Sequence, residues 1–138
     1  MNQIQSLLHL ARWLLLRFGS RMEDTDLIAC KALLPKWEPD LYTVGEVRRH
    51  LGQPWRCIRA HDSREDPQRS PGLSPQLWTV CHSRDLQYAQ PFVEPTGDAD
   101  AYRPGEYMLW TDANCYLCTR RDTYDGPDRN PKAWEIQA

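Results

Sequence analysis

The stretch Tyr-Thr-Val-Gly-Glu at residues 42–46 decides the fold, because it returns as Tyr-Arg-Pro-Gly-Glu at residues 102–106. Two further pairs of short motifs follow in the same order: Trp55-Arg56-Cys57 with Tyr116-Leu117-Cys118, and Pro75-Gln76-Leu77-Trp78 with Pro131-Lys132-Ala133-Trp134. The three offsets are 60, 61 and 56 residues, so order and spacing survive with small changes in loop length. The chain therefore contains a duplicated unit of roughly 45 residues, and such a repeat constrains the architecture more than any single motif does.

Each copy of the repeat predicts a β-hairpin, a polar loop rich in proline, and a short closing strand. In the second copy, residues 106–110 and 115–119 predict two strands, and the turn residues at 112–114 join them. The first copy follows the same plan. We expect the closing strands to be centred on Trp78 and Trp134.

The N-terminal segment predicts helices instead. Apolar residues recur at three- and four-residue spacing over residues 3–18, which is typical of an amphipathic helix. A second helix is expected at residues 26–34, because Asp24 or Thr25 can cap its start and Pro35 ends it.

Charged residues interrupt the apolar run of the first helix, which argues against a signal peptide and against a transmembrane span. Three roles stay open for this helix: a membrane-surface anchor, the seam of an oligomer, or packing back onto the repeats. We expect self-association, because the apolar surface is broad for so small a protein. The residues assigned to docking or oligomerisation are Ile4, Leu7, Leu8, Ala11, Leu14, Leu15 and Phe18.

Composition restricts the class of function. The formal net charge of −2 gives little electrostatic reason to expect a nucleic-acid partner. Five cysteines are an odd number, so no closed disulfide framework is expected. Cys115 and Cys118 have CxxC spacing, but residues three apart on a strand point to opposite faces and would chelate a metal poorly. Neither a metal nor a cofactor is predicted.

The motif order resembles the family 5/12 carbohydrate-binding modules, also called type 3 chitin-binding domains. The likeness covers residues 36–80 and 91–136, where Tyr-x-x-Gly-Glu precedes an aromatic-x-Cys strand and a terminal Trp. Phage and prophage proteins that carry two such modules behind a short helical head are more similar still. That likeness rests on four stretches: Leu34-Pro35-Lys36-Trp37, Ala60-His61-Asp62-Ser63, residues 95–102, and Gly105-Glu106-Tyr107-Met108.

The chain departs from the sugar-binding members of this family at one important place. Those members commonly place two adjacent exposed aromatic residues just after the second hairpin strand, where this chain has Arg59-Ala60 and Arg120-Arg121. Arginine and alanine give no aromatic platform for the apolar face of a pyranose ring. Arg48 and His50 also replace apolar positions, so the first sheet is expected to meet something polar, or a neighbouring subunit, at that face.

Six residues are candidates for ligand contact. Trp110 and Tyr124 lack an equivalent in the other copy, and Tyr88 lies between the copies. His61, Asp62 and Asp122 follow corresponding strands and could form hydrogen bonds with sugar hydroxyls, although they also fit ordinary turn closure.

No active site is predicted. Loop carboxylates are frequent, but glycoside hydrolysis also needs a cleft shaped around a distorted sugar, and two small sheets are poor material for one. No phosphate-binding loop, Ser/His/Asp pattern or His-Glu-x-x-His stretch is present in the sequence. We therefore expect a protein that is not an enzyme.

The expected fold is mainly β, with an N-terminal α-helical hairpin and two small tandem antiparallel β modules. Its parts are a helical docking segment at 1–35, a first module at 36–80, a linker at 81–90, and a second module at 91–138. The resemblance implies a structural protein of a phage or prophage virion (tail, baseplate or other appendage), made in the bacterial host cytoplasm.

Three functions remain open after this. The modules could attach the particle to host-surface glycans, or they could only contact other virion proteins. As a third alternative, the chain could be the targeting module of a polysaccharide-degrading system. Other virion proteins and sister copies of the chain are the expected partners, without nucleic acid and without membrane insertion.

Overall fold

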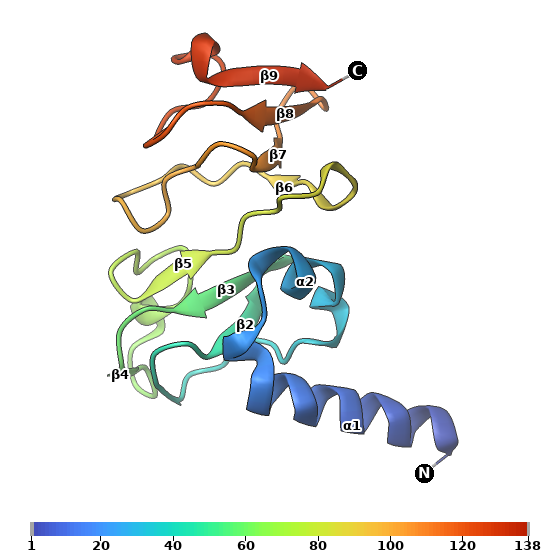
Figure 1. Ribbon diagram of the computed structural model, residues 1–138. Helices are drawn as coiled ribbons and strands as arrows, with labels where there is room; N and C mark the ends of the chain where they lie inside the picture. The colour runs from blue at the N-terminus through green and yellow to red at the C-terminus, as the bar shows by residue number, and fades with distance from the viewer. Residues whose placement is uncertain (1, 138) are drawn as a thin grey trace. The chain divides into compact units, whose positions relative to one another are not determined.

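The computed structural model describes residues 2–137 (Figure 1). The described chain is mainly β with a helical N-terminus, as the sequence predicts. It divides into two units, with the boundary after Cys81. The segment 82–90, expected as a linker, is part of the second unit, and the N-terminal helices are part of the first.

The first helix, α1, covers Gln3–Phe18 and starts at a capping box. The Asn2 side chain accepts a hydrogen bond of 2.8 Å from the Gln5 backbone N–H, and the Gln5 side chain accepts one from the Asn2 N–H. After a 3-10 turn, η1 (Gly19–Arg21), the short helix α2 covers Asp24–Ala29. The two helices make up the predicted helical segment.

The second helix is shorter than predicted. Beyond Ala29 the chain forms a 3-10 turn, η2 (Lys31–Leu33), in which Leu33 and Leu34 donate to carbonyls three residues earlier. Pro35 has no N–H and cannot extend the hydrogen bonding. α2 is still firmly packed, because Leu27 and Ile28 are buried.

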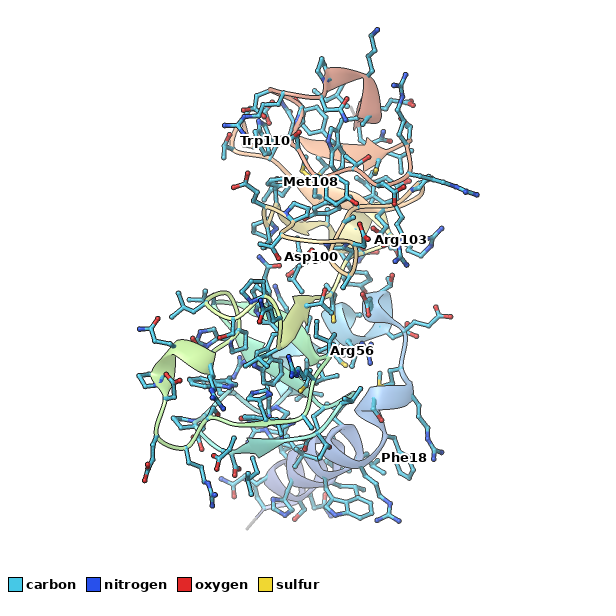
Figure 2. All side chains as sticks on the ribbon, turned by 90° about the vertical axis from the view of Figure 1, so that its left-hand side faces the viewer. Phe18, Arg56, Asp100, Arg103, Met108 and Trp110 are labelled. Carbon is cyan, nitrogen blue, oxygen red and sulfur yellow. The ribbon has the colours of Figure 1, made fainter. Side chains whose placement is uncertain are left out.

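Arg56 holds the N-terminal segment against the first sheet. Its guanidinium donates to the backbone carbonyls of Ser20 at 3.1 Å and Met22 at 3.0 Å. It also forms an ion pair of 3.0 Å with Asp24 at the start of α2 (Figure 2). These three bonds come from one side chain on the central strand of the sheet.

The sheets of the first unit are antiparallel. A pair of short strands, β1 and β4, lies beside a three-stranded sheet in the order β2-β3-β5. The strands are β1 (Leu41–Tyr42), β2 (Val47–His50), β3 (Gln53–Cys57), β4 (His61–Asp62) and β5 (Trp78–Val80). Between β4 and β5 the chain makes one 3-10 turn, η3 (Pro67–Arg69).

The second unit has one four-stranded sheet in the order β6-β7-β8-β9. Its strands are β6 (Gln90–Pro91), β7 (Tyr107–Leu109), β8 (Cys115–Cys118) and β9 (Trp134–Gln137), with 3-10 turns η4 (Leu86–Tyr88) and η5 (Pro131–Ala133). β6 pairs with β7 in parallel, unlike the other strand pairs of this sheet. In the first unit, Lys36 forms a parallel bridge with Arg49 at the corresponding edge.

The repeated Tyr-x-x-Gly-Glu motif forms the same hydrogen-bonded turn in both units. Gly45 and Gly105 have positive φ angles of 95° and 93°, which glycine adopts without strain. The Glu46 carboxylate accepts from the Thr43 N–H at 2.7 Å, and the Glu106 carboxylate accepts from the Arg103 N–H at 2.8 Å. The motif thus specifies a turn that leads into the first hairpin strand.

The repeated tryptophans form the centre of each core. Trp78 packs edge-on against Tyr42, with 4.9 Å between ring centroids, and Trp134 packs against Tyr102 at 5.2 Å. Each indole N–H donates to a backbone carbonyl nine residues earlier, that of Arg69 (3.1 Å) or Asp125 (2.9 Å). Both tryptophans are buried with their polar atom satisfied.

The two cores differ at one position next to the tyrosine. In the second unit Met108 is buried among the aromatic rings (Figure 2). In the first unit Arg48 takes this place, with its guanidinium 5.1 Å from the centre of the Tyr42 ring and 3.5 Å from the Glu46 carboxylate. Arg48 therefore finds its polar partners within the first unit, instead of meeting an outside group.

Candidate functional site

α1 presents an apolar surface that residues 2–137 leave largely exposed. None of its residues is buried, and the exposed fractions of Ile4 and Leu7 are 70% and 66%. Leu8, Leu14 and Phe18 are also exposed, while Ala11 and Leu15 are half-buried. The helix thus does not bury this surface against the repeats of its own chain. Packing onto the repeats was one of the three roles that the sequence left open for it.

An exposed apolar helix raises the question of whether it could cross a membrane. In the part of the chain that the structure describes, no helix combines the length and the apolar character that a membrane span needs.

Trp110 lies in the packed aromatic cluster of the second unit. Its ring meets Phe92 edge-on at 5.0 Å between centroids, and the side chain is half-buried (Figure 2). A Cβ atom added to Gly126 would overlap with the Trp110 ring, so the indole lies directly on the backbone of that glycine. Trp110 is thus packed against both Phe92 and Gly126.

Replacing Gly126 by alanine is expected to destabilise the second unit by about 1–3 kcal/mol, because the new methyl group displaces the Trp110 ring. The Trp110→His change, which copies His50 of the first unit, should recover part of this loss in the double variant. Urea unfolding followed by circular dichroism measures both effects. Gly97→Ala is the matched control, since a Cβ there meets nothing within 4 Å; an equal loss in both variants would contradict the packing.

The other candidates of the second unit lie in its loops. Tyr124 is 36% exposed, and its hydroxyl donates to the Asp98 carboxylate, which raises the pKa of Tyr124 to about 12. Asp122 is exposed and has a left-handed backbone, with φ of 52°. Tyr88 is half-buried in η4. The structure records no contact that joins Trp110, Tyr124 and Tyr88 into one platform.

His61 and Asp62 lie together on β4 of the first unit. The His61 ring contacts Tyr42 and Trp78, and its Nδ1–H donates to the Arg59 carbonyl at 2.7 Å. Asp62 accepts three hydrogen bonds from the Arg64 guanidinium, at 2.8, 3.0 and 3.2 Å, which lower the pKa of Asp62 to about 2. Asp62 is therefore an ionised, partnered carboxylate.

His61 lines a surface pocket of about 670 Å³ in the first unit. The pocket lies between the end of β3 and the long loop before β5, and its polar lining includes Arg59, Gln68, Arg69, Ser74 and Gln76. The sequence marked Arg59 only as a departure from the aromatic platform. It gave no sign of the lining residues in the loop between β4 and β5. Their positions beside the end of β3 depend on the folded course of that loop, which local sequence does not specify.

A second, smaller pocket of about 240 Å³ lies at the edge of β2. It is lined by Lys36, Trp37, Arg49, His50, Leu51 and Gly52, and is called the Trp37 pocket below. The sequence indicated His50 as a polar replacement, but Trp37 and Arg49 were not among the residues expected to contact a ligand. A signal for this pocket could have been the two cation–aromatic pairs in the sequence, Lys36-Trp37 and Arg49-His50.

The two repeated cysteines are shielded from solvent. The Cys57 and Cys118 thiols are buried, which raises their pKa, and each donates to a backbone carbonyl two residues ahead. No group of three His, Cys, Asp or Glu side chains within residues 2–137 could hold a metal ion.

The chain matches no protein-family model and no curated protein sequence. Function is therefore inferred from the residues, contacts and pockets described above.

Proposed function

We propose that this chain is a non-enzymatic structural protein of a phage or prophage particle, located in a tail, baseplate or other appendage. α1 joins copies of the chain to one another, and the β units contact other surfaces. The observation that carries the proposal is the apolar face of α1, none of which is buried. The resemblance of the repeats to modules of phage proteins supports the virion location.

A second copy of the chain is the partner that best fits α1. Ile4, Leu7, Ala11, Leu14 and Phe18 alternate at three- and four-residue spacing, as in the seam of a coiled coil. The four large residues of this seam, Ile4, Leu7, Leu14 and Phe18, contribute about 6–12 kcal/mol when two copies cover each other, counting them as half exposed. That is comparable with the roughly 4–15 kcal/mol lost in association.

The carboxylates and thiols of the β units support a role without catalysis. Asp62 is held by Arg64, and Asp98 accepts from Tyr124. The Cys57 and Cys118 thiols are buried with raised pKa values. A carboxylate paired with a guanidinium and buried thiols with raised pKa values are poorly suited to general acid–base or nucleophilic catalysis.

Host-surface glycan binding is a second candidate, favoured by the His61 surface pocket and the Trp37 pocket of the first unit. The packing of Trp110 on Gly126 speaks against the usual aromatic platform, so sugar binding would use polar side chains. If no sugar binds, a pure assembly role remains. Nothing described here favours the targeting module of a polysaccharide-degrading system.

Particles purified from an induced culture of the host should contain the chain at a fixed ratio to their tail proteins. Mass spectrometry of gradient-purified particles measures this ratio. A variant with Leu7→Asp and Leu14→Asp should be produced but lost from the particles, because its α1 cannot be covered by a second copy. A chain that remains entirely in the soluble lysate, although particles form, would contradict the virion role.

A further inference from the structure

The Trp37 pocket is formed by the parallel edge of the first sheet. The Trp37 N–H donates to the Arg49 carbonyl at 2.8 Å, and the Arg49 N–H donates to the Pro35 carbonyl at 2.9 Å. These bonds fix the Trp37 and Arg49 backbones side by side. The β2–β3 turn closes one end, with Leu51 and Gly52 at positive φ angles of 53° and 75°.

Two side chains that line this pocket each carry a buried N–H donor without an acceptor among residues 2–137. Trp37 Nε1 and Arg49 Nε are both buried and form no hydrogen bond within residues 2–137. Arg49 also forms no ion pair with the described residues, and none of the residues that line the pocket is acidic. Buried donors without acceptors are unfavourable, and a small shift of the Trp37 and Arg49 side chains toward the pocket would let an oxygen-bearing group from outside the chain accept from both.

The second unit shows that this polar edge is not required by the fold. Phe92 and Trp110 meet edge-on there, as Trp37 and His50 do in the first unit with 5.4 Å between centroids. At the place of Arg49 the second unit has Leu109, which pairs with Pro91 in the parallel edge. The same backbone arrangement thus forms without a guanidinium.

We infer that the Trp37 pocket binds the carboxylate or sulfate group of an acidic sugar residue. The Arg49 guanidinium and the exposed Lys36 ammonium supply the positive charge, and the indole N–H supplies a further donor. The Trp37 ring and Leu51, which is 75% exposed, offer apolar contact to the C–H groups of a sugar ring. About 240 Å³ is smaller than the usual pocket for a drug-sized ligand, and suits one sugar residue.

This inference deepens the glycan-binding candidate and depends on it, but not on self-association. An isotope-labelled full chain is titrated with glucuronate, N-acetylneuraminate and glucose 6-sulfate, and with glucose as the neutral control. The acidic sugars should shift the NMR signals of the Trp37 indole N–H and the Arg49 Nε–H, and glucose should not. Trp37→Phe assigns the indole signal.

Arg49→Leu is expected to weaken binding of the acidic sugars at least tenfold, because it removes a charge-assisted donor. Leucine is tolerated at the equivalent position of the second unit, so the variant should fold. Arg64→Gln is the matched control, because it also removes one arginine from the first unit. Arg64 forms an exposed ion pair with Asp62 and does not line the Trp37 pocket, so this variant should leave the affinity unchanged.

Three results would overturn the inference: no shift at Trp37 and Arg49, equal shifts with glucose, or equal losses in the Arg49 and Arg64 variants. Tighter binding of an Asp- and Glu-rich peptide than of any acidic sugar would also overturn it, in favour of an acidic protein partner. The molar mass of the same sample keeps the two proposals apart. An oligomer without sugar binding refutes only the pocket, and a monomer with saturable binding refutes only self-association.

Discussion

Trp78→Ala is expected to unfold the first unit, and Trp134→Ala the second. Each change removes a buried indole, together with its hydrogen bond to Arg69 or Asp125. Such a truncation costs about 3–5 kcal/mol. Small units bury a low fraction of their surface and have little stability to lose. Urea unfolding followed by far-UV circular dichroism measures the loss.

Trp13→Ala is the matched control for both variants. Trp13 is 50% exposed on α1 and lies away from the face formed by Ile4, Leu7 and Leu14. Its replacement should change the free energy of unfolding by less than about 0.5 kcal/mol. If Trp78→Ala costs no more than Trp13→Ala, the repeated tryptophans are not the centres of their cores.

The double change Leu7→Asp and Leu14→Asp is expected to convert the oligomer into a monomer. In a dimer the four lost leucines remove about 3–6 kcal/mol of apolar burial, counting only the exposed part of each side chain. This corresponds to a rise in Kd of roughly 10²–10⁴-fold. Four carboxylates in the seam would weaken association further. Light scattering after size-exclusion chromatography measures the molar mass.

Gln5→Asp serves as the control for an added negative charge, because Gln5 is on the polar side of the same helix and gains one of the two charges that the double variant gains. It should keep the molar mass of the original chain. If Gln5→Asp dissociates the oligomer as fully as the double variant, the added charge causes the dissociation, and the apolar face of α1 is not what holds the copies together.

The sequence predicts those parts of the structure that depend on neighbouring residues. The Tyr-x-x-Gly-Glu repeat forms the same turn twice, since its hydrogen bonds lie within four residues. The spacing of apolar residues gave α1 with its observed bounds. Position in the repeat also placed Trp78 and Trp134 in equivalent closing strands, and the structure has both of them there, buried.

Contacts between distant segments could not be predicted in this way. Nothing local indicates that Trp110 lies on Gly126, or that β6 joins β7 in parallel. The Trp37 pocket depends on a bridge between Lys36 and Arg49, thirteen positions apart in the sequence. Arg49 looked like a solvated charge because its half-buried position follows only from that bridge.

Sedimentation velocity of the unmodified chain over a dilution series tests the central claim most directly. Self-association through α1 predicts a species of at least twice 16.2 kDa that dissociates on dilution. A single species of 16.2 kDa at every concentration would contradict it.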